Sequence, residues 1–288
     1  MKINEMFKDD KNVFSFEVFP PKNDSPIEMV YDTLEQLSEL KPDFISVTYR
    51  AAGDLSDTST CDIASLIKNK YGIESVAHLT CVNSSKESVS HILEQFKKNN
   101  IENILALRGD LIPDKEPLKQ FSYASDLVSF IKEHGDFGVS GACYPEGHEN
   151  SQTLVDDILN LKKKVDAGAS HLITQLFFDN KVMYEFKEKL KLAGINVPVE
   201  AGIMPVCNVN QIKRMISMCG ASVPAKLARI MQKYGDNPDD MREAGIEYAT
   251  EQIIELLNRG IDGIHLYTMN NSYVARKISQ NIKPYLKR

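Results

Sequence analysis

The sequence predicts one α/β domain with the (β/α)8 TIM-barrel fold over residues 1–288, and three observations predict it. Eight short runs rich in β-branched and aromatic residues recur along the chain. An amphipathic segment long enough for a helix separates each run from the next, which indicates parallel strands joined by helices. Eight strands without a glycine-rich GxGxxG turn after the first run favour a closed barrel over a doubly wound sheet.

The expected strands follow one another along nearly the whole chain. They cover residues 13–19, 43–49, 75–82, 103–109, 137–144, 171–178, 197–204 and 263–268. Helical patterns such as SVSHILEQFKKN and TLVDDILNLKKKVDAG fill the intervals, and glycines stand at the joints, where helix ends and turns require them. Extra helical material at about 222–259 precedes the last strand, and we interpret it as an elaborated crossover within the same domain.

Composition and charge exclude several classes of protein. The chain is 42% hydrophobic and 26% charged, which supplies a core and excludes collagen-like and natively unfolded chains. Its net charge of -6 disfavours a nucleic-acid or anionic-membrane partner. The charged N-terminal segment lacks the apolar stretch of a signal peptide, so we expect a cytoplasmic protein. Five cysteines without a CxxC pair predict reduced, mostly buried thiols and no metal site.

Polar residues at the carboxyl ends of the expected strands are the first candidates for chemistry, because barrels carry their sites there. Glu17 is the most unusual of them, since a carboxyl inside the apolar run FSFEVFPP is costly to bury without a partner. It is either half of a salt bridge at the barrel rim or a general acid that its apolar neighbours keep protonated. His78 is either a hydrogen-bonded core histidine or a residue of the site.

Two further features indicate a ligand at the barrel mouth. The sequence LRGD brings Arg108 and Asp110 to the end of the fourth strand, and Gly109 between them would let the backbone approach a planar ligand. The helix after the fifth strand carries three consecutive lysines, which on most helices form a solvated face. Here part of that run shares a face suited to a ribose and a phosphate. The residues of this face are Asp157, Asn160, Lys163 and Lys164.

A series of motifs then identifies a family. In order, they are FSFEVFPPK, SVTY, AHLTC, LALRGD, YASDL, YPEGH, NLKKKVDAGA, ITQLFFD, GIMPV and HLYTMN. Together they resemble the flavin-dependent methylenetetrahydrofolate reductases in their short bacterial form. The resemblance implies a barrel with non-covalent FAD at its mouth that takes a hydride from NADH or NADPH. It then reduces methylenetetrahydrofolate to methyltetrahydrofolate by ping-pong kinetics, in one-carbon metabolism and methionine biosynthesis. Homo-oligomers are common in this family.

The resemblance also implies roles for individual residues. Glu17 matches the catalytic acid that protonates the folate ring nitrogen, and Asp110 matches a catalytic carboxylate that lies beside the flavin and contacts the pterin. Gln175 and Gln211 match substrate-binding positions. The positions that match flavin contacts are Thr48, Tyr49, His78, Arg108, Gly109, Asp110, Tyr123, Ala124, Tyr144, His148, Asp157, Asn160, Lys163 and Lys164.

Two positions depart from the enterobacterial pattern. Met215 replaces an aromatic residue after the seventh strand, and Asn271 replaces an arginine after the eighth, which affects donor stacking and folate-tail binding.

The sequence leaves two alternative enzyme functions open. One alternative is the same folate reduction fed by a partner electron-transfer protein. Another is a proline-dehydrogenase-like flavin barrel, which LRGD and YPEGH fit less well. A catalytically silent subunit is disfavoured by the set of Glu17, Asp110 and Gln175.

Overall fold

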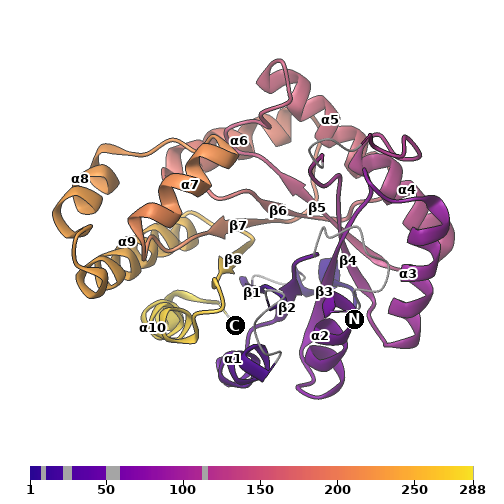
Figure 1. The fold of residues 1–288 in the computed structure, drawn as a ribbon. Coiled ribbons are helices and arrows are strands. Elements are labelled where there is room, and N and C mark those ends of the chain that lie inside the picture. The colour runs from indigo at the N-terminus through magenta and orange to yellow at the C-terminus, as the bar shows by residue number, and fades with distance from the viewer. Residues whose placement is uncertain (8–10, 22–27, 50–58, 112–115, 288) are drawn as a thin grey trace.

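Eight parallel strands close into a barrel in sequence order (Figure 1), in a computed structural model that describes residues 1–7, 11–21, 28–49, 59–111 and 116–287. The strands are β1 (Val13–Val18), β2 (Phe44–Val47), β3 (Glu74–Thr80), β4 (Asn103–Leu107), β5 (Gly138–Cys143), β6 (His171–Thr174), β7 (Val199–Ile203) and β8 (Gly263–Tyr267). The predicted TIM-barrel fold is therefore confirmed.

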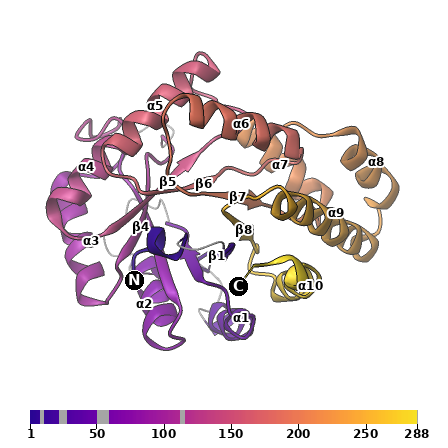
Figure 2. The same cartoon turned by 180° about the vertical axis from the view of Figure 1, so that it is seen from behind.

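Helices connect the strands on the outside of the barrel. They are α1 (Glu28–Ser38), α2 (Ser59–Asn69), α3 (Lys86–Lys98), α4 (Ala124–His134), α5 (Leu154–Asp166), α6 (Asn180–Leu192), α7 (Val209–Cys219), α8 (Ala225–Tyr234), α9 (Pro238–Asn258) and α10 (Ser272–Ile282), with the 3-10 helices η1 (Ile3–Phe7) and η2 (Lys283–Tyr285). Helices α8 and α9 occupy the 222–259 segment and stand out to one side of the barrel (Figures 1 and 2).

Several strands are shorter than the apolar runs that predicted them. The seventh begins at Val199 rather than at 197, where the preceding Pro198 has no N–H to donate to a sheet. The sixth ends at Thr174, but Leu176 and Phe178 beyond it remain buried in a cluster beneath α7, α8 and α9. An apolar run in the sequence therefore predicts which residues are buried, and only some of these residues form the hydrogen bonds of the sheet.

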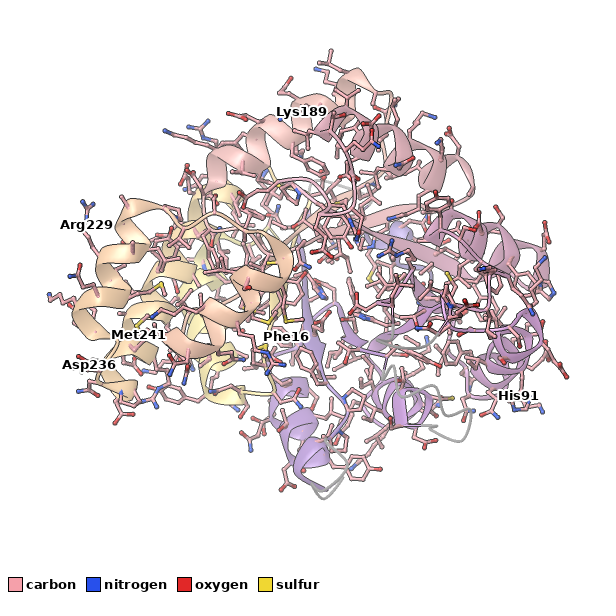
Figure 3. All side chains as sticks on the ribbon, turned by 45° about the horizontal axis from the view of Figure 1, so that its top comes forward. Phe16, His91, Lys189, Arg229, Asp236 and Met241 are labelled. Carbon is pink, nitrogen blue, oxygen red and sulfur yellow. The ribbon has the colours of Figure 1, made fainter. Side chains whose placement is uncertain are left out.

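Successive side chains of β1 point alternately outward to the apolar core and inward to the candidate site residues. Phe14 and Phe16 face outward into the main apolar cluster beneath the helices (Figure 3 labels Phe16). Ser15 and Glu17 face the barrel interior, because successive side chains of a strand point to opposite sides. Strand β1 also closes the barrel by pairing with β8, which sets Glu17 opposite Tyr267.

The cysteines lie mostly in the interior of the protein. All five cysteines are free; three are buried and two half-buried, as predicted. Burial raises the pKa of Cys61 to about 11 and that of Cys81 to about 12, so these thiols stay protonated near neutral pH. Among the described residues, no helix is both long and apolar enough to cross a membrane.

Candidate active site

Glu17 lies inside the barrel between two histidines. Its Oε2 is 3.4 Å from His78 Nε2 and 3.6 Å from His265 Nε2, and the residue is 7% exposed. Burial lowers the pKa of His78 to about 4, against the attraction of Glu17 and with the repulsion of His265. His78 is therefore neutral near pH 7, and its contact with Glu17 is not a charged salt bridge.

The backbone of Glu17, near the end of β1, is hydrogen-bonded to the residue that follows β8. Thr268 Oγ1 donates to the Glu17 carbonyl oxygen over 2.6 Å, and the Tyr267 hydroxyl donates to the Thr174 carbonyl over 2.7 Å. Burial raises the pKa of Tyr267 well above its usual value, so its phenol is neutral. The first bond ties β1 to the residue after β8, and the second ties the end of β8 to the end of β6.

A pocket of about 380 Å³ lies at the carboxyl ends of β4 and β5, beside α4 and α5. This volume is within the usual range for small-molecule sites. Many of the residues that the family resemblance assigned to a flavin line it together. These are Arg108, Tyr123, Ala124, Tyr144, His148, Asp157, Asn160, Lys163 and Lys164.

Burial and hydrogen bonds hold the polar groups of this pocket in place. Lys164 Nζ donates to the Ala142 carbonyl over 2.6 Å, and burial lowers the pKa of Lys164. Asp157 accepts a hydrogen bond from Ser151 Oγ over 2.9 Å. The rings of Tyr144 and His148 meet edge to face, 4.5 Å between centroids. Burial, with the positive charge of Arg108, lowers the pKa of His148.

Gly109 forms a turn that other residues cannot make easily. Its φ is +81°, and a Cβ added there would lie 2.8 Å from Thr80 Cβ. The preceding Arg108 carbonyl accepts from the backbone N–H groups of Cys81 and Val82, over 3.1 and 2.8 Å. The loop after β4 is thus tied to the loop after β3, and the missing side chain lets the Gly109 backbone pack against Thr80.

The other predicted site residues do not line this pocket. Thr48 and Tyr49 are half-buried just after β2, and Asp110 is exposed after β4, where its carbonyl accepts from Asn83 Nδ2. Gln175 is half-buried after β6, with its Oε1 bonded to the Leu176 N–H. Gln211 is exposed in the first turn of α7, the helix that follows β7.

The two positions that depart from the enterobacterial pattern have structural roles here. Met215 is half-buried on α7 and packs against the apolar cluster beneath α7, α8 and α9. Asn271 is the N-cap of α10, and its side chain accepts from the Val274 N–H over 3.1 Å. An Asn cap satisfies one of the free amides at a helix start.

Sequence reasoning missed a set of buried polar residues next to Glu17. They lie on five strands and face the barrel interior: Ser15, Ser46, His171, Glu200 and His265. Glu200 and His265 interrupt the apolar strands VEAGI and GIHLY, and His171 begins the apolar strand HLIT. That interruption is the signal that marked Glu17, and the same test applied to every strand would have found His171, Glu200 and His265.

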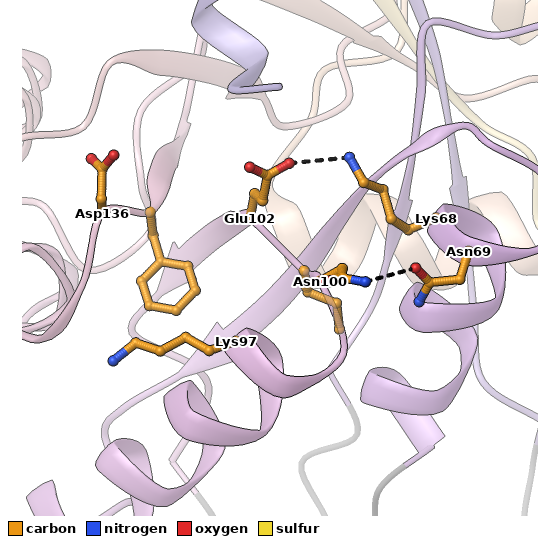
Figure 4. A pocket seen from close by; sticks show the side chains of 8 residues that line it. Lys68, Asn69, Lys97, Asn100, Glu102 and Asp136 are labelled. Carbon is orange, nitrogen blue, oxygen red and sulfur yellow. Dashed lines mark hydrogen bonds and ion pairs between the residues drawn. The ribbon is translucent and has the colours of Figure 1, made fainter.

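A second pocket, of about 430 Å³, lies near the amino ends of β4 and β5 (Figure 4). Its polar side chains bind one another: Lys68 Nζ is 3.1 Å from Glu102 Oε2, and Asn100 Nδ2 donates to Asn69 Oδ1 over 3.1 Å. Polar residues at this end of a barrel serve stability. We therefore take the pocket beside α4 and α5, together with Glu17, as the candidate active site.

An eight-stranded parallel barrel with a polar pocket at the carboxyl ends of its strands defines the class of TIM-barrel enzymes. The family model described as methylenetetrahydrofolate reductase matches residues 2–283, and the chain belongs to this family. The 5,10-methylenetetrahydrofolate reductase of Escherichia coli (strain K12) is 37% identical over 268 residues, covering 93% of this chain and 90% of the relative.

Two other similar proteins differ in length or in sequence. The Arabidopsis thaliana protein named methylenetetrahydrofolate reductase (NADH) 1 is 36% identical over 296 residues, and the chain spans 50% of its length. A solved structure from Clostridium thermocellum, titled as an uncharacterized protein that binds two copies of 5-methyl-5,6,7,8-tetrahydrofolic acid, matches with a TM-score of 0.64. It covers 96% of each chain at 14% identity, which supports the shared fold alone.

Proposed function

We propose that this chain reduces methylenetetrahydrofolate to methyltetrahydrofolate, with non-covalent FAD as its cofactor and NADH or NADPH as the electron donor. The observation that carries the proposal is a buried carboxyl, Glu17, inside the barrel of a chain that belongs to the reductase family. The bacterial relative is 37% identical over 93% of the chain, which supports the same activity.

The residues of the pocket fit a flavin dinucleotide. Lys163 and Lys164 of α5 supply cations for a diphosphate, and Asp157 and Asn160 supply partners for a ribose. Gly109 lets the loop after β4 pack against Thr80, beside Arg108, which lines the pocket. The flavin would supply hydride transfer, which no amino-acid side chain can perform.

The protein's own part in the reaction is to hold a proton and to orient the substrate. A protonated Glu17 would donate from its carboxyl to the folate ring nitrogen that leaves when the ring opens. His78 does not compete for this proton at neutral pH, because its pKa is about 4. In this proposal Asp110 and Gln175 orient the folate from the loops after β4 and β6, and Gln211 does so from α7.

The test separates the two half-reactions. We expect the purified protein to bind FAD, to be reduced by NADH or NADPH in stopped flow, and then to reduce methylenetetrahydrofolate in a separate mixing step. One mouth serving both substrates in turn predicts parallel lines in double-reciprocal plots. Protein that binds no FAD contradicts the proposal. Dithionite-reduced protein that reduces folate, with neither nicotinamide active, would instead indicate a partner electron-transfer protein. A cytoplasmic location and a homo-oligomer stay predictions.

A further inference from the structure

The barrel interior contains more ionisable side chains than the proposed reaction uses. Glu17, His78, His171, Glu200 and His265 are each at most 7% exposed. TIM-barrel interiors are usually filled by branched apolar side chains, and burying an ionisable group is costly unless it has a partner. Glu200 and His171, both nearly inaccessible, have no part in the chemistry proposed above.

A chain of short contacts joins Glu200 to Glu17. Ser15 Oγ donates to Glu200 Oε1 over 2.8 Å and lies 2.6 Å from His265 Nδ1. The other ring nitrogen of His265, Nε2, is 3.6 Å from Glu17 Oε2 and 3.3 Å from Ser46 Oγ. The chain thus crosses the barrel from β7 through β1 and β8 and returns to β1.

The direction of these hydrogen bonds follows from proton counting. A serine hydroxyl has one proton, and Ser15 gives it to Glu200 at 2.8 Å rather than to the Ile264 carbonyl at 3.5 Å. Ser15 Oγ can then only accept from His265, so Nδ1 carries the imidazole proton. In a neutral ring the other nitrogen, Nε2, is then a bare acceptor that faces Glu17.

Glu200 accepts at the start of this chain. Ser15 Oγ donates to its Oε1, and a Glu200 that donated to Ser15 instead would reverse the chain. The other carboxyl oxygen, Oε2, lies 3.0 Å from His171 Nε2. Glu200 therefore contacts one donor hydroxyl and one histidine ring in the barrel interior.

We propose that Glu200 is a positioning residue that acts through Ser15 and His265 to keep the proton on Glu17. This inference rests on the proposed role of Glu17 as the acid. A bare Nε2 repels an ionised Glu17 and is compatible with a protonated one. Without the constraint from Ser15, His265 can carry its proton on Nε2, where an N–H stabilises the Glu17 carboxylate.

The other groups that face Glu17 do not oppose this arrangement. In the described part of the chain they are His78 from β3 and Tyr267 from β8. His78 is neutral above its pKa of about 4, and Tyr267 directs its hydroxyl to the Thr174 carbonyl. Neither supplies a positive charge that would hold Glu17 as a carboxylate near pH 7.

Two buried serines of the barrel strands provide a matched pair of variants. Ser15 and Ser75 are at most 1% exposed, but the Ser75 hydroxyl, on β3, has no hydrogen-bond partner in the described part of the chain. Ser15→Ala cuts the chain between Glu200 and His265, whereas Ser75→Ala removes a buried hydroxyl outside it. In Ser15→Ala we expect the pH at which folate reduction falls to half to drop by about one unit, a tenfold change in proton affinity. Folate reduction by Ser75→Ala, and flavin reduction by both variants, should keep the wild-type pH profile.

The tautomer of His265 gives a readout that needs neither cofactor nor activity. In ¹⁵N-histidine NMR spectra of the protein without cofactor, with His265 assigned by its loss in His265→Gln, we expect a protonated Nδ1 and a bare Nε2. In Ser15→Ala the proton should move to Nε2 in part or in full. A wild-type His265 that carries its proton on Nε2 overturns the proposal, even if Ser15→Ala does not fold.

The outcomes distinguish this inference from the proposed function. Wild-type protein that reduces no methylenetetrahydrofolate contradicts the function, and the NMR result then still decides the direction of the hydrogen-bond chain. Wild-type protein that reduces folate, with the same pH profile in Ser15→Ala, contradicts the role of Glu200. A shift of equal size in Ser75→Ala shows a general effect of a lost buried hydroxyl and also contradicts it.

Discussion

Glu17 owes its proposed chemistry to a buried position beside the neutral His78. We expect Glu17→Gln to lower the rate of folate reduction by about 10²- to 10⁴-fold, the usual contribution of a general acid. Flavin reduction by the nicotinamide needs no proton from this residue and should keep its rate. Stopped-flow measurement of the two half-reactions separately tests this. Equal loss in both would mean that the carboxyl has a structural role.

Asp110 differs from Glu17 because its side chain is exposed at the mouth. A carboxylate beside a flavin opposes the negative charge that the ring gains on reduction, so Asp110→Asn should raise the flavin midpoint potential. A change on the order of 30 mV corresponds to about 1.4 kcal/mol for a two-electron couple, and dye equilibration resolves it. Folate affinity should also fall, through the lost pterin contact.

A control separates a local effect from a change in overall charge. Glu133 on α4 is also an exposed carboxylate, so Glu133→Gln removes the same charge from the molecule. Its midpoint potential should match the wild-type value. An unchanged potential in Asp110→Asn, with weaker folate binding, would make Asp110 a substrate ligand alone.

Helix α5 presents two neighbouring lysines in different environments. Lys163 lines the pocket beside α4 and α5, whereas Lys162 pairs with Asp166 of the same helix. If the pocket binds a diphosphate, Lys163→Ala should weaken FAD affinity about tenfold, or 1.4 kcal/mol, and leave riboflavin affinity unchanged. Fluorescence titration of both ligands measures this. A similar loss of FAD affinity in Lys162→Ala would indicate a general charge effect and contradict a specific contact.

The elements could be predicted from the sequence because each leaves a local pattern. Apolar runs marked all eight strands, and the four polar positions predicted to share a face of α5 do line one pocket. The ends of the strands were less accurate, since burial continues past the last sheet hydrogen bond, as at Phe178 after β6. Local pattern therefore predicts which residues share an element better than where that element stops.

The whole barrel brings together what no local pattern joins. Ser15 and His265 are 250 positions apart, and they become neighbours because β1 pairs with β8 when the barrel closes. Strand alternation predicts that Ser15 and Glu17 share a side of β1. The register of the closing pair then decides which histidine they meet. The surroundings of Glu17 could thus be obtained only from the three-dimensional structure.

Burial of His78 couples the stability of the whole molecule to pH. Its pKa is about 4 in the folded protein, chiefly because of burial, against about 6.5 for an exposed histidine. The unfolded chain therefore binds a proton more readily between these values. From this group, the free energy of unfolding should fall by about 1.4 kcal/mol per unit as pH drops from 6.5 toward 4, about 3 kcal/mol in all. Above pH 6.5 the group contributes no pH dependence.

Urea denaturation at several values of pH measures the slope of the free energy of unfolding against pH. The variants are compared by this slope, because a substitution in the core also changes the free energy of unfolding itself at every pH. Between pH 4 and 6.5, the free energy of unfolding of His78→Gln should depend less on pH, because the contribution of His78 is lost. His91 is exposed at the periphery of the molecule (Figure 3), so His91→Gln makes the same substitution outside the core and should keep the wild-type slope. A wild-type slope in His78→Gln would mean that His78 binds its proton equally in both states, and that the charged imidazolium has a partner inside the barrel.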